Sequence, residues 1–286
     1  MITGRTKLLG VLGAPIEHSL SPVLQNAALR TAGLDYVYVA LPVKKDALRS
    51  AVPGLRDAGF CGFNVTIPFK TEIIALLDAL DEDARRIGAV NTVVVGADGC
   101  LTGYNTDAAG FLAGFTACGV SLRGAHAVVL GAGGAARAVL CGLLRAGVAQ
   151  VSVGVRNLVK GEKLCADFAS DGDVRAFRFD DAAFQARLGS ADVLVQTTPL
   201  GMSPHMEETP PVDWAAVHPA ALVYDLIYTP AETRFLREAA RHGHRCVNGE
   251  TMLAAQGAEA FFLWTGVRPD LACMRHALRE ALDRRA

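Results

Sequence analysis

The sequence predicts an α/β fold with at least one parallel sheet, and three observations support this prediction. A Gly-rich turn at 131–134 joins the apolar run 128–130 to the Ala-rich segment 135–144. Strands that alternate with helical segments form parallel sheets with right-handed crossovers. The length of 286 residues exceeds that of most single cores and suggests two domains. Further apolar runs, which we expect to be strands, follow at 151–155, 191–195 and 221–225.

The Gly-rich turn has the spacing of a dinucleotide-binding site. Gly131, Gly133 and Ala136 fit the pattern G-x-G-x-x-G/A between a strand and a helix. Glycine lets the backbone turn tightly and approach a ligand, and the first N–H groups of a helix attract an anion. We therefore expect a Rossmann-type parallel-sheet domain, with a turn used only for packing as the alternative. The residues expected at the pyrophosphate are Gly131, Ala132, Gly133, Gly134 and Ala135.

The residues after the second strand of this domain distinguish NADP from NAD. NAD enzymes usually place Asp or Glu there to bind the ribose 2′-OH, whereas this chain has Arg156, Asn157 and Lys160. Arg and Lys attract a 2′-phosphate, and Arg can bind it through two hydrogen bonds. Arg156 and Lys160 share a face if the segment is helical. We expect NADP, with a solvated basic patch as the alternative, and the lack of an acidic residue near Arg156 argues against NAD.

Composition and charge exclude several classes of protein. The net charge of −1 gives no basic excess for binding nucleic acid. The seven cysteines are scattered without C-x-x-C, which indicates neither a zinc site nor a disulfide framework. No secretory leader pattern opens the chain; the apolar run 8–16 is too short to span a membrane, and Arg137 and glycines interrupt the run 125–144. We expect a cytoplasmic enzyme without a metal, nucleic-acid or membrane partner.

The first half of the chain predicts a second α/β unit. A strand within 84–95 should pair with 101–104 across a hairpin turn at 97–100. The C-terminal part predicts two helices, at 248–264 and at about 270–282. The other elements expected in the first half are strands at 8–12, 36–41 and 63–67 and helices at 23–32, 48–58, 68–80 and 108–118.

Two pairs of polar side chains in this half are candidates for ligand binding. Ser21 fits an N-cap and Pro22 the first helical position, which leaves the Ser19 hydroxyl free beside the helix start. Two hydroxyls there suit a polyhydroxy ligand, while helix capping alone is the alternative. Asn64 and Thr66 lie two residues apart in an expected strand, so their side chains share one face.

Four further side chains are candidates because of where they stand. Lys70 would lie in the first turn of a helix starting at Pro68, where the helix dipole disfavours a cation; binding or proton transfer would explain it, and solvated surface is the alternative. Asn91 and Asp107 each flank a strand end and could face one cleft, although Asp107 also suits a helix cap. Gln256 lies among apolar residues, and a buried amide needs partners that a ligand can supply.

The order of these motifs resembles the shikimate dehydrogenase family over essentially the whole chain. Several distinct motifs in order are far more specific than a lone Gly-rich loop. The resemblance implies NADPH-dependent, reversible reduction of 3-dehydroshikimate to shikimate in aromatic amino-acid biosynthesis. The motifs that carry it are at 18–22 (HSLSP), 64–70 (NVTIPFK), 88–92 (GAVNT), 103–107 (GYNTD), 131–135 (GAGGA), 225–230 (DLIYTP) and 249–256 (GETMLAAQ).

The resemblance also implies a domain organisation and a set of site residues. A substrate domain at 1–107 plus 243–286 would flank an inserted NADP domain at 108–242. Lys70 and Asp107 would form the catalytic pair. Substrate would be held by Ser19, Ser21, Asn64, Thr66, Asn91, Tyr228 and Gln256. Besides the Gly-rich turn, NADP would contact Arg156, Asn157, Lys160, Thr197, Thr198, Leu226, Gly249 and Met252.

Two departures from the family pattern concern the cofactor. The family usually has Asn-Arg-Thr where this chain has Val155-Arg156-Asn157, and its nicotinamide-side loop often begins with Asn where this chain has Gln196. Other readings remain open: a quinate/shikimate or aminoshikimate dehydrogenase, a folate methylene dehydrogenase with a catalytic lysine, or an NADP-sensing regulatory protein. Serine at position 21 favours shikimate over quinate, and no aromatic folate slot is evident. The protein is expected to be a monomer or a homodimer.

Overall fold

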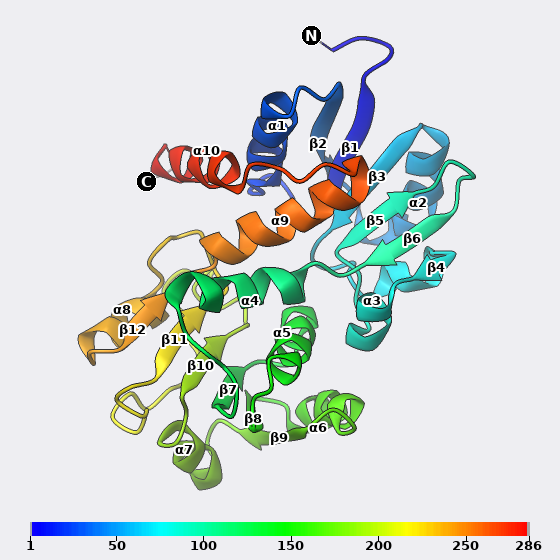
Figure 1. Cartoon of the computed structure of the whole chain (residues 1–286). Helices are drawn as coiled ribbons and strands as arrows, with labels where there is room; N and C mark the ends of the chain where they lie inside the picture. Colours follow the sequence, from blue (N-terminus) through cyan, green and yellow to red (C-terminus); the bar gives the residue numbers. More distant parts are fainter. Residues whose placement is uncertain (1, 285–286) are drawn as a thin grey trace. The chain divides into compact units, whose positions relative to one another are not determined.

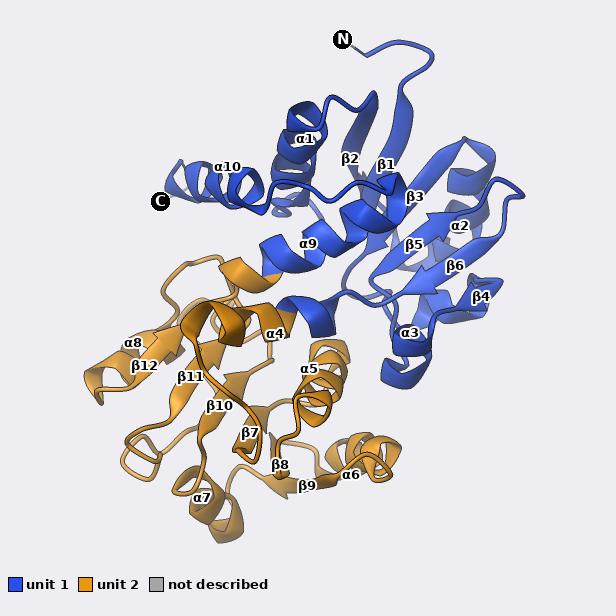
Figure 2. Cartoon of the chain, in the orientation of Figure 1, with its two compact units in different colours: residues 1–110, 253–286 blue, residues 111–252 orange. Residues whose placement is uncertain are grey.

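The computed structural model describes residues 2–284, and the chain divides into two compact units (Figure 2). Unit 1 is formed by residues 1–110 and 253–286, and unit 2 by residues 111–252. The boundaries lie inside helices α4 (Asp107–Cys118) and α9 (Glu250–Thr265).

The predicted domain limits differ from these units at both boundaries. The larger difference is at the predicted division between 242 and 243, because strand β12 (Arg245–Val247) pairs with β11 (Leu222–Asp225) and belongs to unit 2. The first division falls at 110/111 instead of 107/108 because α4 begins in unit 1. Residues 1, 285 and 286 of the predicted substrate domain lie outside the described residues.

Unit 1 is built on a mixed six-stranded sheet with the order β2-β1-β3-β5-β6-β4 (Figure 1). β1 pairs in parallel with both β2 and β3, and β4 pairs in parallel with β6. β5 pairs antiparallel with β3 and β6, which confirms the expected hairpin. The strands are β1 (Lys7–Gly13), β2 (Tyr36–Pro42), β3 (Phe60–Val65), β4 (Ala79–Leu80), β5 (Thr92–Val95) and β6 (Leu101–Tyr104).

Two apolar layers cover this sheet. One contains Leu24, Phe261 and Met274, from α1, α9 and α10, packed on Leu9 and Val11 of β1. The other packs α2, α3 and η2 on strand residues of opposite orientation, such as Leu12 and Phe63. The helices of unit 1, besides α9, are α1 (Ser21–Thr31), α2 (Leu48–Asp57), α3 (Glu82–Ile87) and α10 (Leu271–Asp283), with 3-10 turns η1 (Lys45–Ala47) and η2 (Glu72–Leu76).

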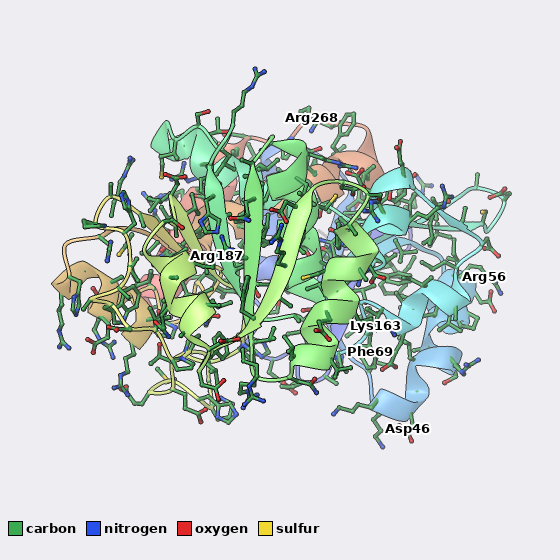
Figure 3. The ribbon with its side chains drawn as sticks, turned by 90° about the horizontal axis from the view of Figure 1, so that it is seen from below. Asp46, Arg56, Phe69, Lys163, Arg187 and Arg268 are labelled. Atoms are coloured by element: carbon green, nitrogen blue, oxygen red, sulfur yellow. The ribbon has the colours of Figure 1, made fainter. Side chains whose placement is uncertain are left out.

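The helix predicted at 68–80 is wrong. Turns over 68–71 lead into η2, and then Ala79–Leu80 forms β4. The segment is held by contacts that a sequence pattern does not reveal: Phe69 (labelled in Figure 3) is fully buried in the core of unit 1, and β4 pairs with β6. Lys70 therefore lies in a turn, and the helix-dipole argument for it does not apply.

The expectation that Ser21 caps α1 is also wrong. Leu20 is the N-cap residue and makes no side-chain capping bond, while Ser21 is the first residue of the helix. Ser19 supplies an acceptor instead, because its Oγ accepts a hydrogen bond of 3.3 Å from the backbone N–H of Ser21. Contrary to expectation, the Ser19 hydroxyl is therefore not free.

Unit 2 contains a six-stranded sheet in which all strands are parallel, in the order β12-β11-β10-β7-β8-β9. This arrangement confirms the predicted Rossmann-type fold. The remaining strands are β7 (His126–Leu130), β8 (Gln150–Val155), β9 (Asp173–Arg178) and β10 (Val193–Gln196). The helices are the second part of α4 and α5 (Gly134–Arg145), α6 (Leu158–Phe168), α7 (Ala182–Leu188) and α8 (Arg234–Arg241).

Helices cover both faces of this sheet. Val223 packs in a cluster with Phe184 of α7 and Phe235 of α8, whereas the adjacent Tyr224 points the other way and stacks on Phe111 of α4, 5.3 Å between ring centroids. Arg187 of α7 lies beside the strands in Figure 3, with its guanidinium 5.5 Å from the Phe177 ring. Burial of both faces explains why the strands of this sheet read as nearly continuous apolar runs.

Candidate active site

Lys70 and Asp107 form an ion pair in unit 1. Lys70 Nζ lies 2.5 Å from Asp107 Oδ2, and the two side chains are 20% and 8% exposed. Asp107 is the first residue of α4, and Asn105 Oδ1 accepts a hydrogen bond from its backbone N–H. The backbone oxygen of Lys70 accepts a bond of 2.7 Å from Val90 N, which ties the turn to the segment before β5. The expected pair is therefore brought together by elements 37 residues apart in sequence.

Asn91 holds the second oxygen of this carboxylate. Its Nδ2 donates to Asp107 Oδ1 at 2.8 Å and to Thr106 Oγ1 at 2.9 Å. Its Oδ1 accepts from Thr106 N at 2.9 Å, so the amide orientation is fixed by a donor and an acceptor. Asn91 and Asp107 are both buried and contact each other directly. Both carboxylate oxygens of Asp107 are thus engaged, one by Lys70 and one by Asn91.

A chain of hydrogen bonds leads from Asn91 to Ser21. Asn64 Nδ2 donates to the Asn91 backbone oxygen at 3.0 Å, and Tyr38 OH donates to Asn64 Oδ1 at 2.6 Å. Burial raises the pKa of Tyr38 well above its usual value, and a hydrogen bond with Ser21 acts in the opposite direction. Ser21, Asn64, Asn91 and Asp107 therefore belong to one connected polar cluster.

Gln256 joins the same cluster from α9. Its Oε1 lies 3.4 Å from both Asn91 Nδ2 and Thr106 Oγ1, and its Nε2 donates to Leu253 O at 2.9 Å. The sequence predicted that this amide needs partners, and the protein itself provides three. The side chain is nevertheless partly exposed, so it can also present its amide to a ligand.

Two of the expected substrate residues in unit 1 make described contacts with other parts of that unit. Ser19 bonds the α1 start, and Thr66 donates its backbone N–H to Leu12 O while its methyl group lies close to Gly13. Tyr228 follows β11 and belongs to unit 2. Conversely, Tyr38 and Thr106 belong to the cluster but were not predicted from the sequence. Thr106 stands inside the 103–107 motif, which was the available signal; Tyr38 had none, because an alternating strand contains many such residues.

The Gly-rich turn of unit 2 leaves room for a ligand at the start of α5. Gly131 has φ of +110°, and a Cβ there would lie 2.9 Å from Thr197 Oγ1 and Thr198 Cγ2. Gly133 is the N-cap and has no side-chain capping bond. At Gly133 and Gly134, a Cβ would meet no described atom within 4 Å beyond the immediate neighbours and the helix backbone. Open space above unsatisfied helix N–H groups is the geometry that a pyrophosphate requires.

The loops at the carboxyl ends of β10 and β11 are held by buried side chains. Gln196 accepts from Thr198 N at 2.6 Å and donates to Leu200 O at 2.9 Å, so this residue, which replaces the family's usual Asn, fastens the loop. Asp225 accepts from Thr233 Oγ1 at 2.6 Å and from Ile227 N at 3.0 Å. Burial raises the pKa of Asp225 to about 7.

Gly249 lies beside this second loop, in the segment that leads from β12 to α9. A Cβ on Gly249 would lie 2.0 Å from Leu226 O, so glycine is needed there for the backbones to approach. Gly249 N also donates to Ile227 O at 3.0 Å. Met252 is buried. The structure gives Gly249 a packing reason that does not depend on a ligand.

The residues after β8 differ from expectation in two ways. Arg156 precedes Asn157, which is the N-cap of α6 and accepts from Lys160 N at 3.1 Å, so Arg156 and Lys160 do not share a helical face. Arg156 instead lines a cavity of about 270 Å³ in unit 2. Asp180 lines the same cavity, so the inference that no acidic residue lies near Arg156 is wrong. Asp180 is distant in sequence and reaches this place because β9 pairs with β8.

The described residues 2–284 bear on the expectations about metal sites, disulfides and membrane spans. Within them, no three His, Cys, Asp or Glu residues are grouped to hold a metal ion. All seven cysteines, which lie in this range, are free. No helix among these residues has the length and apolar character needed to cross a membrane.

Comparison with known proteins gives the family. Residues 11–93 match the shikimate dehydrogenase substrate binding domain, and residues 249–279 match the shikimate 5′-dehydrogenase C-terminal domain. A relative from Geobacter metallireducens named shikimate dehydrogenase (NADP(+)) is 46% identical over 99% of both chains. The chain belongs to the shikimate dehydrogenase family.

Solved structures of this family have the same fold. A shikimate dehydrogenase in complex with NADP+ matches with a TM-score of 0.90 and 38% identity, over 99% of this chain and 98% of the other. The Thermus thermophilus shikimate 5-dehydrogenase in complex with NADP(H) and shikimate matches with 0.87 and 40%, over 96% and 100%. A quinate dehydrogenase from Corynebacterium glutamicum in complex with NAD also matches, with 0.87 and 29%, over 96% and 99%.

Proposed function

We propose that this protein is an NADP-dependent shikimate dehydrogenase that reversibly reduces 3-dehydroshikimate to shikimate, a step of chorismate and aromatic amino-acid biosynthesis. The observation that carries this proposal is the partly buried Lys70–Asp107 ion pair, which lies beside amide and hydroxyl groups that are already oriented. Such a cluster presents hydrogen-bonding groups suited to a small polyhydroxy acid. The Geobacter metallireducens relative is by name an NADP(+) shikimate dehydrogenase, and the Thermus thermophilus enzyme was solved with NADP(H) and shikimate.

Lys70 and Asp107 are the catalytic pair in this proposal. When bound, NADPH supplies a hydride to the substrate carbonyl carbon. Negative charge then grows on the carbonyl oxygen, which the Lys70 ammonium stabilises and which receives a proton from the pair. Asp107 orients the ammonium and the developing hydroxyl, with its own position fixed by Asn91. The proton is assigned to the pair and not to either residue, because the two groups share one short hydrogen bond.

Substrate hydroxyls and the carboxylate are assigned to the polar side chains of the family motifs. Asn64, Asn91 and Gln256 are oriented by the protein before substrate arrives, which lowers the entropic cost of positioning it. Ser19, Ser21, Thr66 and Tyr228 complete the set that we assign to the substrate.

The residues of unit 2 fit NADP on the evidence of their own geometry. The open start of α5 suits the pyrophosphate, and the exposed Arg156 at the end of β8 suits a 2′-phosphate. We assign the remaining contacts to Ala132, Ala135, Asn157, Lys160, Thr197, Thr198, Leu226, Gly249 and Met252.

Quinate and aminoshikimate are the alternative substrates. The quinate dehydrogenase that shares this fold shows that the architecture alone does not select between these acids. Quinate carries one more hydroxyl at the carboxylate-bearing carbon, so the groups near Ser21 decide the choice.

One assay tests these alternatives together. NADP+ and NAD+ reduction is measured in parallel with shikimate, quinate and aminoshikimate as substrates. We expect the highest kcat/KM for the shikimate and NADP+ combination. A higher value with quinate or aminoshikimate would reassign the substrate, while nucleotide binding without turnover on all three acids would favour an NADP-sensing regulatory protein.

Two properties of the whole molecule complete the proposal. We place the enzyme in the cytoplasm, because seven free cysteines suit a reducing compartment. It is proposed to act on its small-molecule substrate as a monomer or homodimer, which sedimentation equilibrium distinguishes by mass.

A further inference from the structure

The cavity of unit 2 lies where two neighbouring parallel strands end. Val155 and Arg156 come from the end of β8, and Arg178 and Asp180 from the end of β9. Phe179 N donates to Val155 O at 3.2 Å, which holds the two strand ends together. The volume is about 270 Å³, and Val155, Phe179 and Pro211 provide apolar walls. Carboxyl ends of the strands are where open α/β sheets bind their ligands.

Arg178 and Asp180 are paired through two parallel hydrogen bonds at this cavity. Arg178 Nε donates to Asp180 Oδ1 at 2.9 Å, and its Nη2 donates to Oδ2 at 3.0 Å. The bond to Arg178 lowers the pKa of Asp180, so this carboxylate is ionised at neutral pH. Both of its oxygens face the guanidinium, while three of the five guanidinium N–H donors remain for another anion.

A carboxylate in this position matters for the choice of nucleotide. In NAD enzymes, the carboxylate that accepts a hydrogen bond from the ribose 2′-OH usually follows the second strand, which is β8 here. Asp180 follows β9 but lines the same cavity as Arg156, and an unpaired carboxylate there would attract a ribose hydroxyl and repel a 2′-phosphate. Pairing with Arg178 weakens both effects, because each carboxylate oxygen already accepts a hydrogen bond and the guanidinium offsets the charge. Arg156 and Arg178 both line the cavity, and Asp180, the one acidic residue of its lining, is paired with Arg178.

We propose that the Arg178–Asp180 pair is a specificity determinant for the 2′-phosphate of NADP, in which Arg178 masks Asp180 and adds a second cation beside Arg156. This inference rests on the proposed function, because it takes the cavity to be the 2′-phosphate end of the nucleotide site. Removing the Asp180 charge should shift the nucleotide preference towards NADP, and removing Arg178 should shift it towards NAD.

The same strand offers a matched control. Arg175 and Asp173 form an exposed pair on β9 with Nε to Oδ1 at 2.8 Å, and neither residue lines the cavity. Exposed ion pairs of this kind contribute little to stability, so none of the variants should unfold the protein. Thermal unfolding of each variant checks that the fold is retained.

The test measures nucleotide binding directly by isothermal titration calorimetry. NADP+, NAD+, 2′,5′-ADP and 5′-AMP are titrated into the wild type and the variants Arg178→Ala, Asp180→Asn and Arg175→Ala. For Arg178→Ala, we expect Kd for NADP+ and 2′,5′-ADP to rise about 10-fold to 100-fold, the effect of losing one charge-assisted contact. Kd for NAD+ and 5′-AMP should stay constant or fall, since Asp180 becomes available to the ribose.

The other variants sharpen the result. Asp180→Asn should keep or tighten NADP+ binding, and Arg175→Ala should match the wild type for all four ligands. A ratio of NAD+ to NADP+ dissociation constants that stays within about twofold of wild type in Arg178→Ala overturns this inference alone. A wild-type protein that binds neither NADP+ nor 2′,5′-ADP contradicts the proposed function, and the inference falls with it.

Discussion

The candidate sites of the two units are formed by different kinds of chemical group. In unit 1, buried side chains satisfy one another: Asn91 makes bonds to Thr106 and Asp107, and Asn64 is held by Tyr38. In unit 2, the groups that we assign to the nucleotide are the backbone around Gly133 and Gly134 and exposed residues such as Arg156. The first site is fixed by side chains before any ligand arrives, whereas the second presents unsatisfied donors and open space.

This difference follows from what each ligand demands. A small cyclic acid with several hydroxyls is distinguished by the angles of individual hydrogen bonds, so its partners must be held rigidly. A pyrophosphate needs charge and close approach of the backbone, which glycine and a helix start provide. Substitutions in unit 1 should therefore act on turnover and substrate binding, and those in unit 2 on nucleotide binding.

Lys70→Ala should have the largest effect of the variants that separate turnover in unit 1 from nucleotide binding in unit 2. It removes the charge that stabilises the carbonyl oxygen and the donor of the shared proton, so kcat should fall by about 10²-fold to 10⁴-fold. Kd for NADPH, measured by fluorescence titration, should stay within about twofold because the nucleotide residues belong to unit 2. Lys163→Ala, an exposed lysine on α6 (Figure 3), is the control. Turnover near the wild-type rate would remove Lys70 from the mechanism.

Two glycines of unit 2 distinguish packing from binding. Gly249→Ala places a Cβ 2.0 Å from Leu226 O, so we expect the free energy of unfolding to fall by about 3 kcal/mol. Gly134→Ala adds a methyl group in open space at the first position of α5, which should leave stability unchanged or slightly higher. The same methyl group should weaken NADP+ binding by occupying the pyrophosphate space. Urea denaturation and calorimetry measure the two quantities, and equal stability of both variants would contradict the assignment.

The sequence predicted the elements whose local signals agree with the final fold. Apolar runs bounded by glycine became β7 and β8, and α5 and α10 lie where their patterns placed them. The error at 68–80 arose because burial of Phe69 and pairing of β4 with β6 are long-range contacts that override a local helix signal. Intrinsic propensity is a weak guide where tertiary contacts compete with it.

The candidate site was predicted where a motif carries its residues, and missed where only the fold joins them. Lys70, Asn91 and Asp107 stand in separate motifs, and the structure brings them together. Tyr38 reaches Asn64 from a neighbouring part of the sheet, a contact that depends on the order β2-β1-β3. Asp180 reaches Arg156's cavity through the pairing of β8 and β9. Strand order is a property of the whole fold and has no signal in a single strand.

Asp225 is a buried side chain of unit 2 that is held by hydrogen bonds, as the polar cluster of unit 1 is. Its titration tests how strongly burial acts on it. Burial raises its pKa to about 7 from an ordinary value of 3.8, so the folded state favours the protonated form. The stability that the protein has with a protonated Asp225 is fully present below about pH 4. It is lost progressively as the pH rises towards 7, because ionisation is easier in the unfolded chain. Asp225→Asn cannot ionise and can still accept from Ile227 N and bond to Thr233.

The pH dependence of the difference between this variant and the wild type isolates Asp225 from other groups. The free energy of unfolding of Asp225→Asn should exceed that of the wild type by an amount that grows between about pH 5 and pH 7, by about 2 kcal/mol in total. Urea denaturation at each pH measures it. A difference that is constant with pH would show that the carboxyl group titrates normally.

Tyr38→Phe makes the smallest change and tests the rigidity of unit 1. It removes the O–H that donates to Asn64 Oδ1, leaving a buried acceptor without that partner, so the free energy of unfolding should fall by about 1 kcal/mol. Because Asn64 then loses its fixed orientation, KM for shikimate should rise a few-fold, while kcat and the Kd of NADPH stay constant. Tyr36→Phe is the control on the same strand, since its hydroxyl bonds only to the exposed Lys7 among the described contacts. If Tyr38→Phe lowers stability without changing KM, the chain of hydrogen bonds supports the fold but does not position the substrate. Positioning of the substrate would then depend on Asn91 and its partners Thr106 and Asp107.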